Sequence, residues 1–489
     1  MYIILHTYMS TSESKSRRHP HQRPGPNPAL PALQSKGSSR RLLATFRGLL
    51  AQTELLLALE HVEANFYDRL FSPVVTLWYM VFQRLNPDHS LQAAVTNASQ
   101  GGADALARPR QLPLSARMRS LATTAFNNAR QRLPVSLLHT ALAAQGQQVC
   151  RHLRDWRWRR WHVVLLDGSQ IRLRPFPEVS AQFESSSNQR GKAYWVLMRV
   201  VVVFCAHTGL ALASAVGSTT VSEQALVVPL ILKGLANSLY IGDANFGVFW
   251  IVQTVFRARA QCLVRLTRSR ALKLLGPGHR GLDRCLDQPI TWHPSRADRR
   301  TSGADSQPLR GRLIVYCYHR RGFRNRWLYL FTTLVDTQSY TAEDLFALYG
   351  VRWQIELDLR YVKSQMGMGQ LECKSAPMAE KEWLAGLIGY NLVRTLMVAT
   401  AAQRSVPVGR LSFSAARRLL LEWMRDWGTA GLSSWTRLLD QVAGLHQPTR
   451  PKPRPSEPRR KRHIRETFPP LRGSRVAARR QVRQSNLKS

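Results

Sequence analysis

The chain has 489 residues, and its 70 Lys plus Arg against 30 Asp plus Glu give a formal net charge of +40. Hydrophobic residues make up 44% of the chain and aromatic residues 9%. This excludes wholesale disorder and suggests roughly two to four domains. The charge exceeds what solubility requires and favours a polyanionic partner, because phosphates attract cations that otherwise repel one another. The alternative is a solvated basic surface in an arginine-rich chain.

Cysteine spacing and apolar runs exclude several classes of protein. The six cysteines form no CxxC pair and no histidine stands at zinc-finger spacing, so we expect neither a disulfide framework nor a zinc site. The N-terminal segment MYIILHTYMSTSESKSRR has too short an apolar run for a secretory signal. The most apolar stretch, residues 196–216, is interrupted by Arg199 and His207 and predicts a buried hairpin instead of a membrane span.

The N-terminal third of the chain divides into two parts. Residues 10–40 are rich in Ser, Pro, Arg and Gln and lack apolar periodicity, which predicts disorder. From residue 41 to 160, apolar residues recur every three to four positions, with Pro73 and Pro134 as breaks. This pattern predicts a small helical domain.

Short runs of β-branched residues begin at Trp161. The runs WHVVLLDG, YWVLMRVVVVFC and LALASAVG predict three successive strands, followed by a helix over about 222–237. The segment SLYIGD predicts a fourth strand, residues 246–259 a helix, and QCLVRLT a fifth strand. This order is typical of a mixed sheet flanked by helices, an α/β fold.

The chain returns to β character between residues 268 and 335. The runs QPITWHPS, GRLIVYCYHRR and RNRWLYLFTTLV predict a strand-rich insertion into the α/β domain. A long helix is predicted from Thr341, where Thr341-x-x-Asp344 resembles a capping box, to about Gln365. Further helices are predicted at 379–402 and 412–445, and residues 447–489 carry 14 basic and 2 acidic residues in a dispersed, Pro-rich tail.

Three carboxylates stand at positions that suggest chemistry. Asp167 follows the predicted strand VVLL, and Asp243 follows LYIG in the same way, so the two converge if those strands are neighbours. Glu356 is on the long helix, where Tyr349, Arg352 and Lys363 fall within roughly 60° of it at about 100° per residue. Arg360 lies on the same stripe. A stripe of cations beside a carboxylate suits a phosphodiester backbone next to a metal ion.

The chemistry of phosphoryl transfer explains why three carboxylates would be needed. Two Mg²⁺ ions about 3.5 to 4 Å apart can activate the attacking oxygen and stabilise the leaving oxygen. Magnesium prefers hard oxygen ligands and retains several waters, so a few carboxylates and the substrate phosphates suffice.

Together these segments resemble the DDE transposases of the insertion sequence 4 family, with a DDE_Tnp_1-type domain. The resemblance rests on LLDGSQIRL, LYIGDANFG, the β-rich insertion and the YREK signature Tyr349-x2-Arg352-x3-Glu356-x6-Lys363. It covers roughly residues 60 to 470. One departure is that Ala244-Asn245 follow Asp243, where many relatives have Arg-Gly.

The resemblance implies a ribonuclease-H-like mixed sheet with flanking helices, interrupted by the insertion and joined by helical N- and C-terminal regions. It implies Asp167, Asp243 and Glu356 as catalytic residues and ligands of two Mg²⁺ or Mn²⁺ ions. By the same analogy Arg352 and Lys363 would contact phosphates, and Tyr349 would position the terminal backbone. Trp292, in the basic insertion, is nominated to stack on an unpaired base.

The activity implied is metal-dependent cleavage at the ends of an insertion sequence and strand transfer into target DNA. The partners would be double-stranded DNA, as terminal inverted repeats and target, and a second copy of the chain in a homodimer on DNA. We expect a cytoplasmic, nucleoid-associated bacterial protein and no membrane partner. The alternatives left open are an inactive transposase-derived DNA-binding protein and a stand-alone ribonuclease-H-like nuclease.

Composition, periodicity and the resemblance together predict seven regions along the chain. They are a disordered basic arm (1–40), a helical DNA-binding region (41–160), the first part of the catalytic core (161–267), the β-rich insertion (268–335), the second part of the core (336–375), a helical C-terminal region (376–446) and a disordered basic tail (447–489).

Two further acids have simpler explanations in the sequence. Glu223, at the start of a predicted helix, is expected to be a surface acid favoured by the helix dipole. Asp358 points about 200° away from Glu356 and is expected to be solvated.

Overall fold

The computed structural model describes residues 70–445, except 107–110, 152, 155–156, 189–190, 277–284, 303–306, 319–325 and 426–429. It also describes residues 30, 33–35 and 39–48 and a few residues between 474 and 484. The predicted basic arm and basic tail therefore lie almost entirely outside the described residues.

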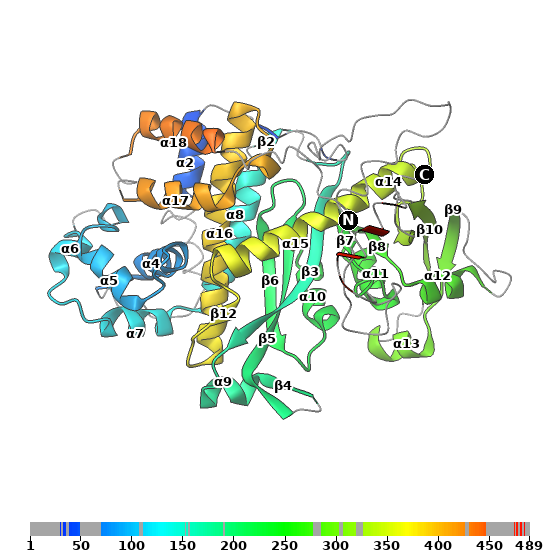
Figure 1. Ribbon diagram of the computed structural model, residues 1–489, viewed down its shortest axis with the longest axis horizontal. Coiled ribbons are helices and arrows are strands. Elements are labelled where there is room, and N and C mark those ends of the chain that lie inside the picture. Colours follow the sequence, from blue (N-terminus) through cyan, green and yellow to red (C-terminus); the bar gives the residue numbers. More distant parts are fainter. Residues whose placement is uncertain are drawn as a thin grey trace.

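The centre of the molecule is a mixed sheet (Figure 1). Its middle strands are β3 (His162–Leu173), β5 (Gly191–Cys205), β6 (Ala211–Ser218), β7 (Ser238–Gly242) and β8 (Gln261–Arg265). β3 pairs antiparallel with β5, which pairs antiparallel with β6; on its other side β3 pairs parallel with β7, and β7 with β8. These are the five strands predicted from the β-branched runs, so that prediction is confirmed.

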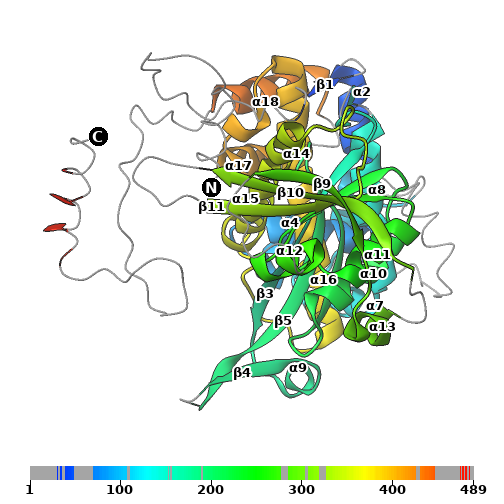
Figure 2. The same ribbon diagram turned by 90° about the vertical axis from the view of Figure 1, so that its right-hand side faces the viewer.

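The strands from the predicted insertion extend the same sheet. β11 (Arg326–Thr332) pairs antiparallel with β8, β10 (Leu309–Tyr318) with β11, and β9 (Leu286–Trp292) with β10. Figure 2 shows β9, β10 and β11 side by side. Two helices accompany them, α12 (Arg268–Leu275) and α13 (Arg296–Ser302).

Short strands complete the sheet at the opposite side. β4 (Glu184–Asn188) pairs with β5, and β12 (Gln370–Leu371) pairs parallel with the end of β3. Helix α9 (Pro177–Gln182) connects β3 to β4 and begins with Pro at its first turn, where the missing N–H costs nothing.

The two faces of the sheet belong to separate hydrophobic clusters. Val164 and Leu166 on β3 pack in one cluster with residues of α10 (Glu223–Leu232) and α11 (Phe249–Arg257). Val163 and Leu165 point the other way, into the larger cluster that also contains the helical regions. Alternation along a strand requires this division, and it places residues 167 and 169 on the face opposite α10.

The helical regions pack around one long helix, α16 (Ala376–Arg404). The other helices are α2 (Ser39–Gly48), α4 (Pro73–Leu85), α5 (Leu91–Ser99), α6 (Leu114–Arg117), α7 (Thr124–Arg132), α8 (Val135–Arg151), α17 (Phe413–Trp423) and α18 (Leu432–Gly444). Helices α4, α8, α17 and α18 all contact α16, so helices from both ends of the chain share one core.

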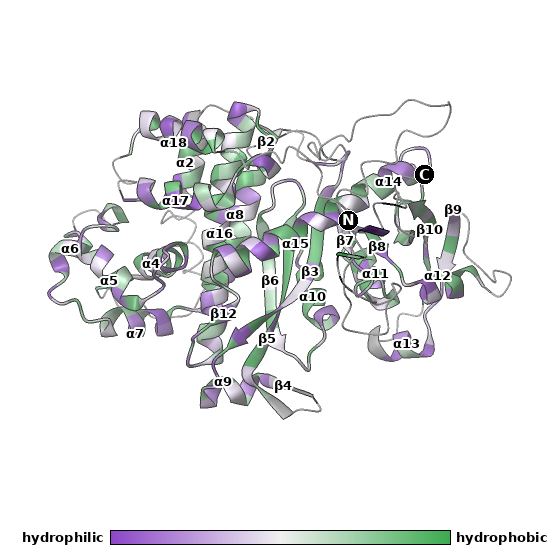
Figure 3. Ribbon diagram, in the orientation of Figure 1, coloured by the Kyte–Doolittle hydropathy of each residue, from purple (hydrophilic) through white to green (hydrophobic). Residues whose placement is uncertain are grey.

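Among the described helices, α16 alone is long and apolar enough to cross a membrane by length and composition. Its apolar window is entirely buried inside the molecule. Figure 3 shows its hydrophobic colouring continuing into α8 and the central strands. α16 is therefore the core helix of the helical region.

The predicted long helix is present and runs across β3 (Figure 1). It consists of α14 (Ala342–Tyr349), a 3₁₀ turn (Gly350–Arg352), α15 (Trp353–Arg360) and a π turn (Tyr361–Gln365). The Thr341 hydroxyl accepts a hydrogen bond from the Asp344 N–H at 3.2 Å, so the predicted cap is confirmed.

Candidate active site

Asp167 lies on β3, and Asp243 directly follows the end of β7, the parallel strand beside it. The register of β3 and β7 pairs Leu165 with Ile241, and continuing it by two residues brings the two aspartates opposite each other. Because alternate residues share a face of a sheet, both carboxylates point to the same side as Leu165 and Ile241. Each aspartate is half-buried.

The surroundings of Asp167 disfavour its charged form. Burial raises its pKa to about 6, and the negative charges of Asp243 and Glu223 add to this effect. A hydrogen bond from the Gly168 N–H at 2.9 Å and the Arg352 guanidinium act in the opposite direction. The raised pKa of Asp167 is therefore due mainly to burial, with nearby carboxylates adding to it.

Glu356 reaches the same place from helix α15, which packs along β3. Arg352 donates a hydrogen bond from Nη2 to Glu356 Oε1 at 2.7 Å, and its charge also acts on Asp167. The Arg352 side chain is 9% exposed and the Glu356 side chain 38%. Arg352 thus links the helix carboxylate to the strand carboxylate.

Tyr349 lies deeper than the sequence predicted. The residue is 1% exposed, in the core beside Arg352, and burial raises its pKa to about 12. Tyr349 is enclosed in the core instead of exposed on the helix stripe, and its contact with a terminal DNA backbone stays a prediction. Tyr349 packs against the arginine that holds Glu356.

The two remaining cations of the helix stripe differ in exposure. Arg360 is exposed, and its guanidinium lies 6.0 Å from the centre of the Tyr361 ring. Lys363 is partly buried, and its Nζ donates a hydrogen bond to the hydroxyl of Ser169 at 3.0 Å. Ser169 shares a face of β3 with Asp167, so Lys363 lies on the carboxylate side of the sheet.

The position of Trp292 differs from the prediction that it stacks on a base. It is 6% exposed at the end of β9, and its ring packs edge-on against Phe331, with centroids 4.9 Å apart, and against Phe249, with centroids 6.0 Å apart. An enclosed ring cannot stack on a base, so the nomination of Trp292 as a stacking residue does not hold in this structure.

Asp358 also differs from expectation. It is completely buried instead of solvated, with Oδ1 3.9 Å from an Arg394 nitrogen on α16 and accepting a hydrogen bond from Gln354 at 3.2 Å. Its direction away from Glu356 was correct, but that direction leads into α16 and not into solvent. The pair joins the helix that carries Glu356 to the helical core.

Glu223 is a residue that the sequence analysis placed on the surface. In the structure it is half-buried at the start of α10, and burial raises its pKa, with Asp243 contributing. Its Oε2 accepts a hydrogen bond from Asn245 Nδ2 at 2.8 Å. The signal that could have revealed it is the glycine after Asp167, which leaves space for its carboxylate.

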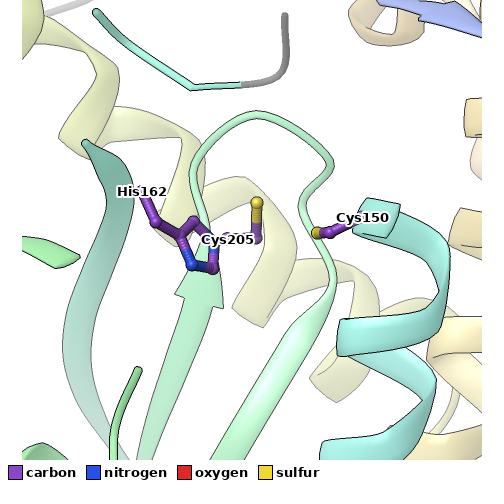
Figure 4. Close-up of side chains that lie close together, drawn as sticks. All are labelled: Cys150, His162 and Cys205. Carbon is purple, nitrogen blue, oxygen red and sulfur yellow. The ribbon is translucent and has the colours of Figure 1, made fainter. Parts of the chain in front are cut away.

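A second cluster joins the helical region to the sheet. Figure 4 shows Cys150 of α8, His162 of β3 and Cys205 of β5 converging, with their ligand atoms all within 4.8 Å of one another. Burial would raise the pKa of Cys205, but hydrogen bonds and charge from Cys150 and His162 outweigh it and lower that pKa. The trio has one ligand fewer than a structural zinc site, and we interpret it as a hydrogen-bonded junction. The spacing of residues in the sequence did not reveal this cluster, because its members come from three separate elements.

The donor set at Asp167, Asp243 and Glu356 fits hard divalent cations. All three supply carboxylate oxygens, the ligands that Mg²⁺ prefers. Beside them, Nε of the buried Arg352 has no hydrogen-bond partner among the described residues. An unpaired donor next to carboxylates is a suitable contact for a phosphate oxygen.

Residues 160–392 match the protein family described as Transposase DDE domain. The matched residues contain the central strands of the mixed sheet, and DDE transposases generally use divalent metal ions. The transposase InsG of insertion sequence element IS4 from Escherichia coli (strain K12) is 23% identical over 335 residues, which are 67% of this chain and 73% of that protein. Residues 160–392 therefore carry a transposase DDE domain, and the chain is similar to the transposase of an IS4 element.

Among the solved structures, the piggyBac transposase synaptic complex with hairpin DNA is similar. It is 10% identical, and the match covers 84% of this chain and 86% of that chain with a TM-score of 0.38. A likeness of this degree does not by itself establish a shared fold.

Proposed function

We propose that this transposase cleaves DNA at the ends of its own insertion sequence and joins the freed 3′-hydroxyl to target DNA. In this proposal Asp167, Asp243 and Glu356 hold two Mg²⁺ or Mn²⁺ ions per active site. The observation that carries it is the position of Asp167 on β3 and of Asp243 at the end of the neighbouring parallel strand β7, with Arg352 bonded to Glu356 and acting on Asp167 through its charge.

The sheet supports a ribonuclease-H-like core for this activity. The strand order β6, β5, β3, β7, β8 is antiparallel on one side of β3 and parallel on the other. The first parallel pair of strands therefore carries both aspartates, and a helix crossing β3 supplies the third acid.

The side chains of the site would have different roles in phosphoryl transfer. When bound, the divalent ions would activate the attacking oxygen and stabilise the leaving oxygen. Arg352 orients the Glu356 carboxylate, and its buried Nε can donate to a phosphate oxygen near the scissile bond. Lys363 and the exposed Arg360 would add electrostatic attraction to neighbouring phosphates.

The partners follow from the reaction. The DNA would be the terminal inverted repeats of the element and then the target duplex, gripped through much of the +40 net charge. Two element ends need two active sites, so we propose a homodimer on DNA. The same reasoning gives a cytoplasmic, nucleoid-associated location in a bacterium.

Cleavage of a duplex containing an element end tests the proposal. Asp167→Asn, Asp243→Asn and Glu356→Gln should each abolish Mg²⁺-dependent cleavage while leaving DNA binding measurable. Glu343→Gln, an exposed glutamate in the first turn of α14, is the matched control and should cleave normally. Retained cleavage in any of the first three variants would overturn the assignment of that residue.

A joining assay separates the two alternatives. A pre-cleaved end and a plasmid should yield a joined product with the wild-type chain. A stand-alone nuclease would cleave without joining, and an inactive DNA-binding descendant would bind without doing either.

A further inference from the structure

The carboxylate of Glu223 occupies the space above Gly168. A Cβ atom at residue 168 would overlap all three heavy atoms of that carboxylate. Gly168 directly follows Asp167, and its missing side chain points to the α10 face of the sheet. The glycine thus allows Glu223 to reach the edge of β3 from the face opposite Glu356.

Asn245 fixes Glu223 to the second aspartate. Its Nδ2 donates to Glu223 Oε2 at 2.8 Å, and its backbone N–H donates to Asp243 Oδ1 at 2.9 Å. Gln224 Nε2 in turn donates to the Asn245 carbonyl at 2.6 Å.

A role as a simple helix-end acid does not explain this geometry. The N-terminus of α10 is already capped by Ser222, whose hydroxyl accepts from the Ala225 N–H at 3.1 Å. The Glu223 side chain turns back onto the strand that carries Asp167, where its carboxylate lies against Gly168.

We propose that Glu223 is a fourth carboxylate of the divalent-cation site, positioned by Gly168 and Asn245 beside Asp167 and Asp243. The inference rests on the proposed function, because it assumes that these aspartates bind the metal ions. Holding a fourth acid beside two aspartates costs electrostatic repulsion, and a bound cation removes that cost.

Binding of Mn²⁺ to the full chain without DNA tests the role of Glu223 separately from activity. Electron paramagnetic resonance measures the free Mn²⁺ in a titration, and Asp243→Asn should lose binding. Glu223→Gln should bind Mn²⁺ about tenfold more weakly than wild type, the scale of loss typical when a residue supporting a metal site is removed. Glu343→Gln removes the same charge from the first turn of α14 and should bind as wild type.

Asn245→Ala is the second variant, because it leaves Glu223 in place but removes the donor that fixes it. It should weaken Mn²⁺ binding less than Glu223→Gln does. Thermal unfolding without metal should show Glu223→Gln to be folded and no less stable than wild type, whereas a purely structural role would lower stability and leave Mn²⁺ affinity unchanged.

These outcomes distinguish a wrong assignment of Glu223 from a wrong assignment of the metal site. Loss of binding in Asp243→Asn with wild-type affinity in Glu223→Gln would overturn the role of Glu223 alone. Wild-type affinity in Asp243→Asn would overturn the metal site itself and the proposed function with it.

Discussion

The ammonium group of Lys363 donates a hydrogen bond to the hydroxyl of Ser169 at 3.0 Å, two residues beyond Asp167 on β3. A lysine with one hydroxyl partner keeps two donors available. Its charge is therefore held at a fixed point beside the carboxylates, ready for a phosphate oxygen.

Replacing Lys363 with alanine should weaken DNA binding at low salt and reduce the salt dependence by about one unit of slope, because one phosphate contact is lost. Fluorescence anisotropy over a salt series measures this slope. Lys233→Ala, at an exposed lysine after α10, is the control and should leave the slope unchanged. An unchanged slope in Lys363→Ala would exclude a phosphate contact by this side chain.

Asp167→Asn should stabilise the metal-free protein above pH 6. The pKa of Asp167 is about 6 in the folded chain, above its ordinary value of 3.8, so between these pH values the folded state binds more protons than the unfolded state. Stability is therefore lost as pH rises through this window. Thermal melts in EDTA should show a higher Tm for the variant at pH 8 and a difference that vanishes near pH 4. Equal melting at pH 8 would contradict the buried, charged state of Asp167.

Added Mg²⁺ should reverse the order of stability. A ligand that binds only the folded state raises the melting temperature, and the variant lacks a ligand for it. Melts at pH 8 should show Mg²⁺ raising the Tm of the wild-type chain more than that of Asp167→Asn. Equal shifts would show that Asp167 does not bind the ion.

Asp358→Ala should destabilise the chain by about 3 to 5 kcal/mol, because it leaves the buried Arg394 without its counter-charge. Urea unfolding measures the change. The double variant Asp358→Leu with Arg394→Met should recover part of the loss, since an apolar pair leaves no buried charge. If Asp358→Ala unfolds like wild type, the two residues do not interact in solution.

Trp292→Ala should cost about 3 to 5 kcal/mol in the free energy of unfolding, as expected for truncating an enclosed ring. Its DNA affinity, measured where the variant is folded, should equal that of wild type. Tyr194→Ala, at an aromatic side chain that is 67% exposed, is the control for stability. A selective loss of affinity in Trp292→Ala would restore the stacking role.

Local sequence patterns were sufficient for the central elements of the fold. Buried strands such as β3 and β5 are nearly continuous runs of apolar, β-branched residues, and the start of α14 has a capping threonine, so neither depends on distant partners. The joining of β9, β10 and β11 to the edge of β8 could not be predicted, because hydrogen bonding between strands depends on register and not on composition.

The candidate site was predictable where residues follow strand ends and helical periodicity. Asp167, Asp243 and Glu356 could be nominated in this way. The depth of Tyr349, the burial of Asp358 and the enclosure of Trp292 could not, because each depends on a side chain far away in sequence, such as Arg394 or Phe331. Glu223 was missed because a helix-start acid has an adequate local explanation.

The backbone of the π turn at Tyr361–Gln365 sets the position of Lys363 relative to Glu356. A π turn contains one more residue than an α-helical turn needs. Deleting one residue ahead of Lys363 there would restore regular α-helical hydrogen bonding and move Lys363 one position along the helix. The more regular helix would then carry Lys363 away from Ser169. In this segment, deleting a residue would disturb the position of Lys363 more than substituting a neighbouring residue would.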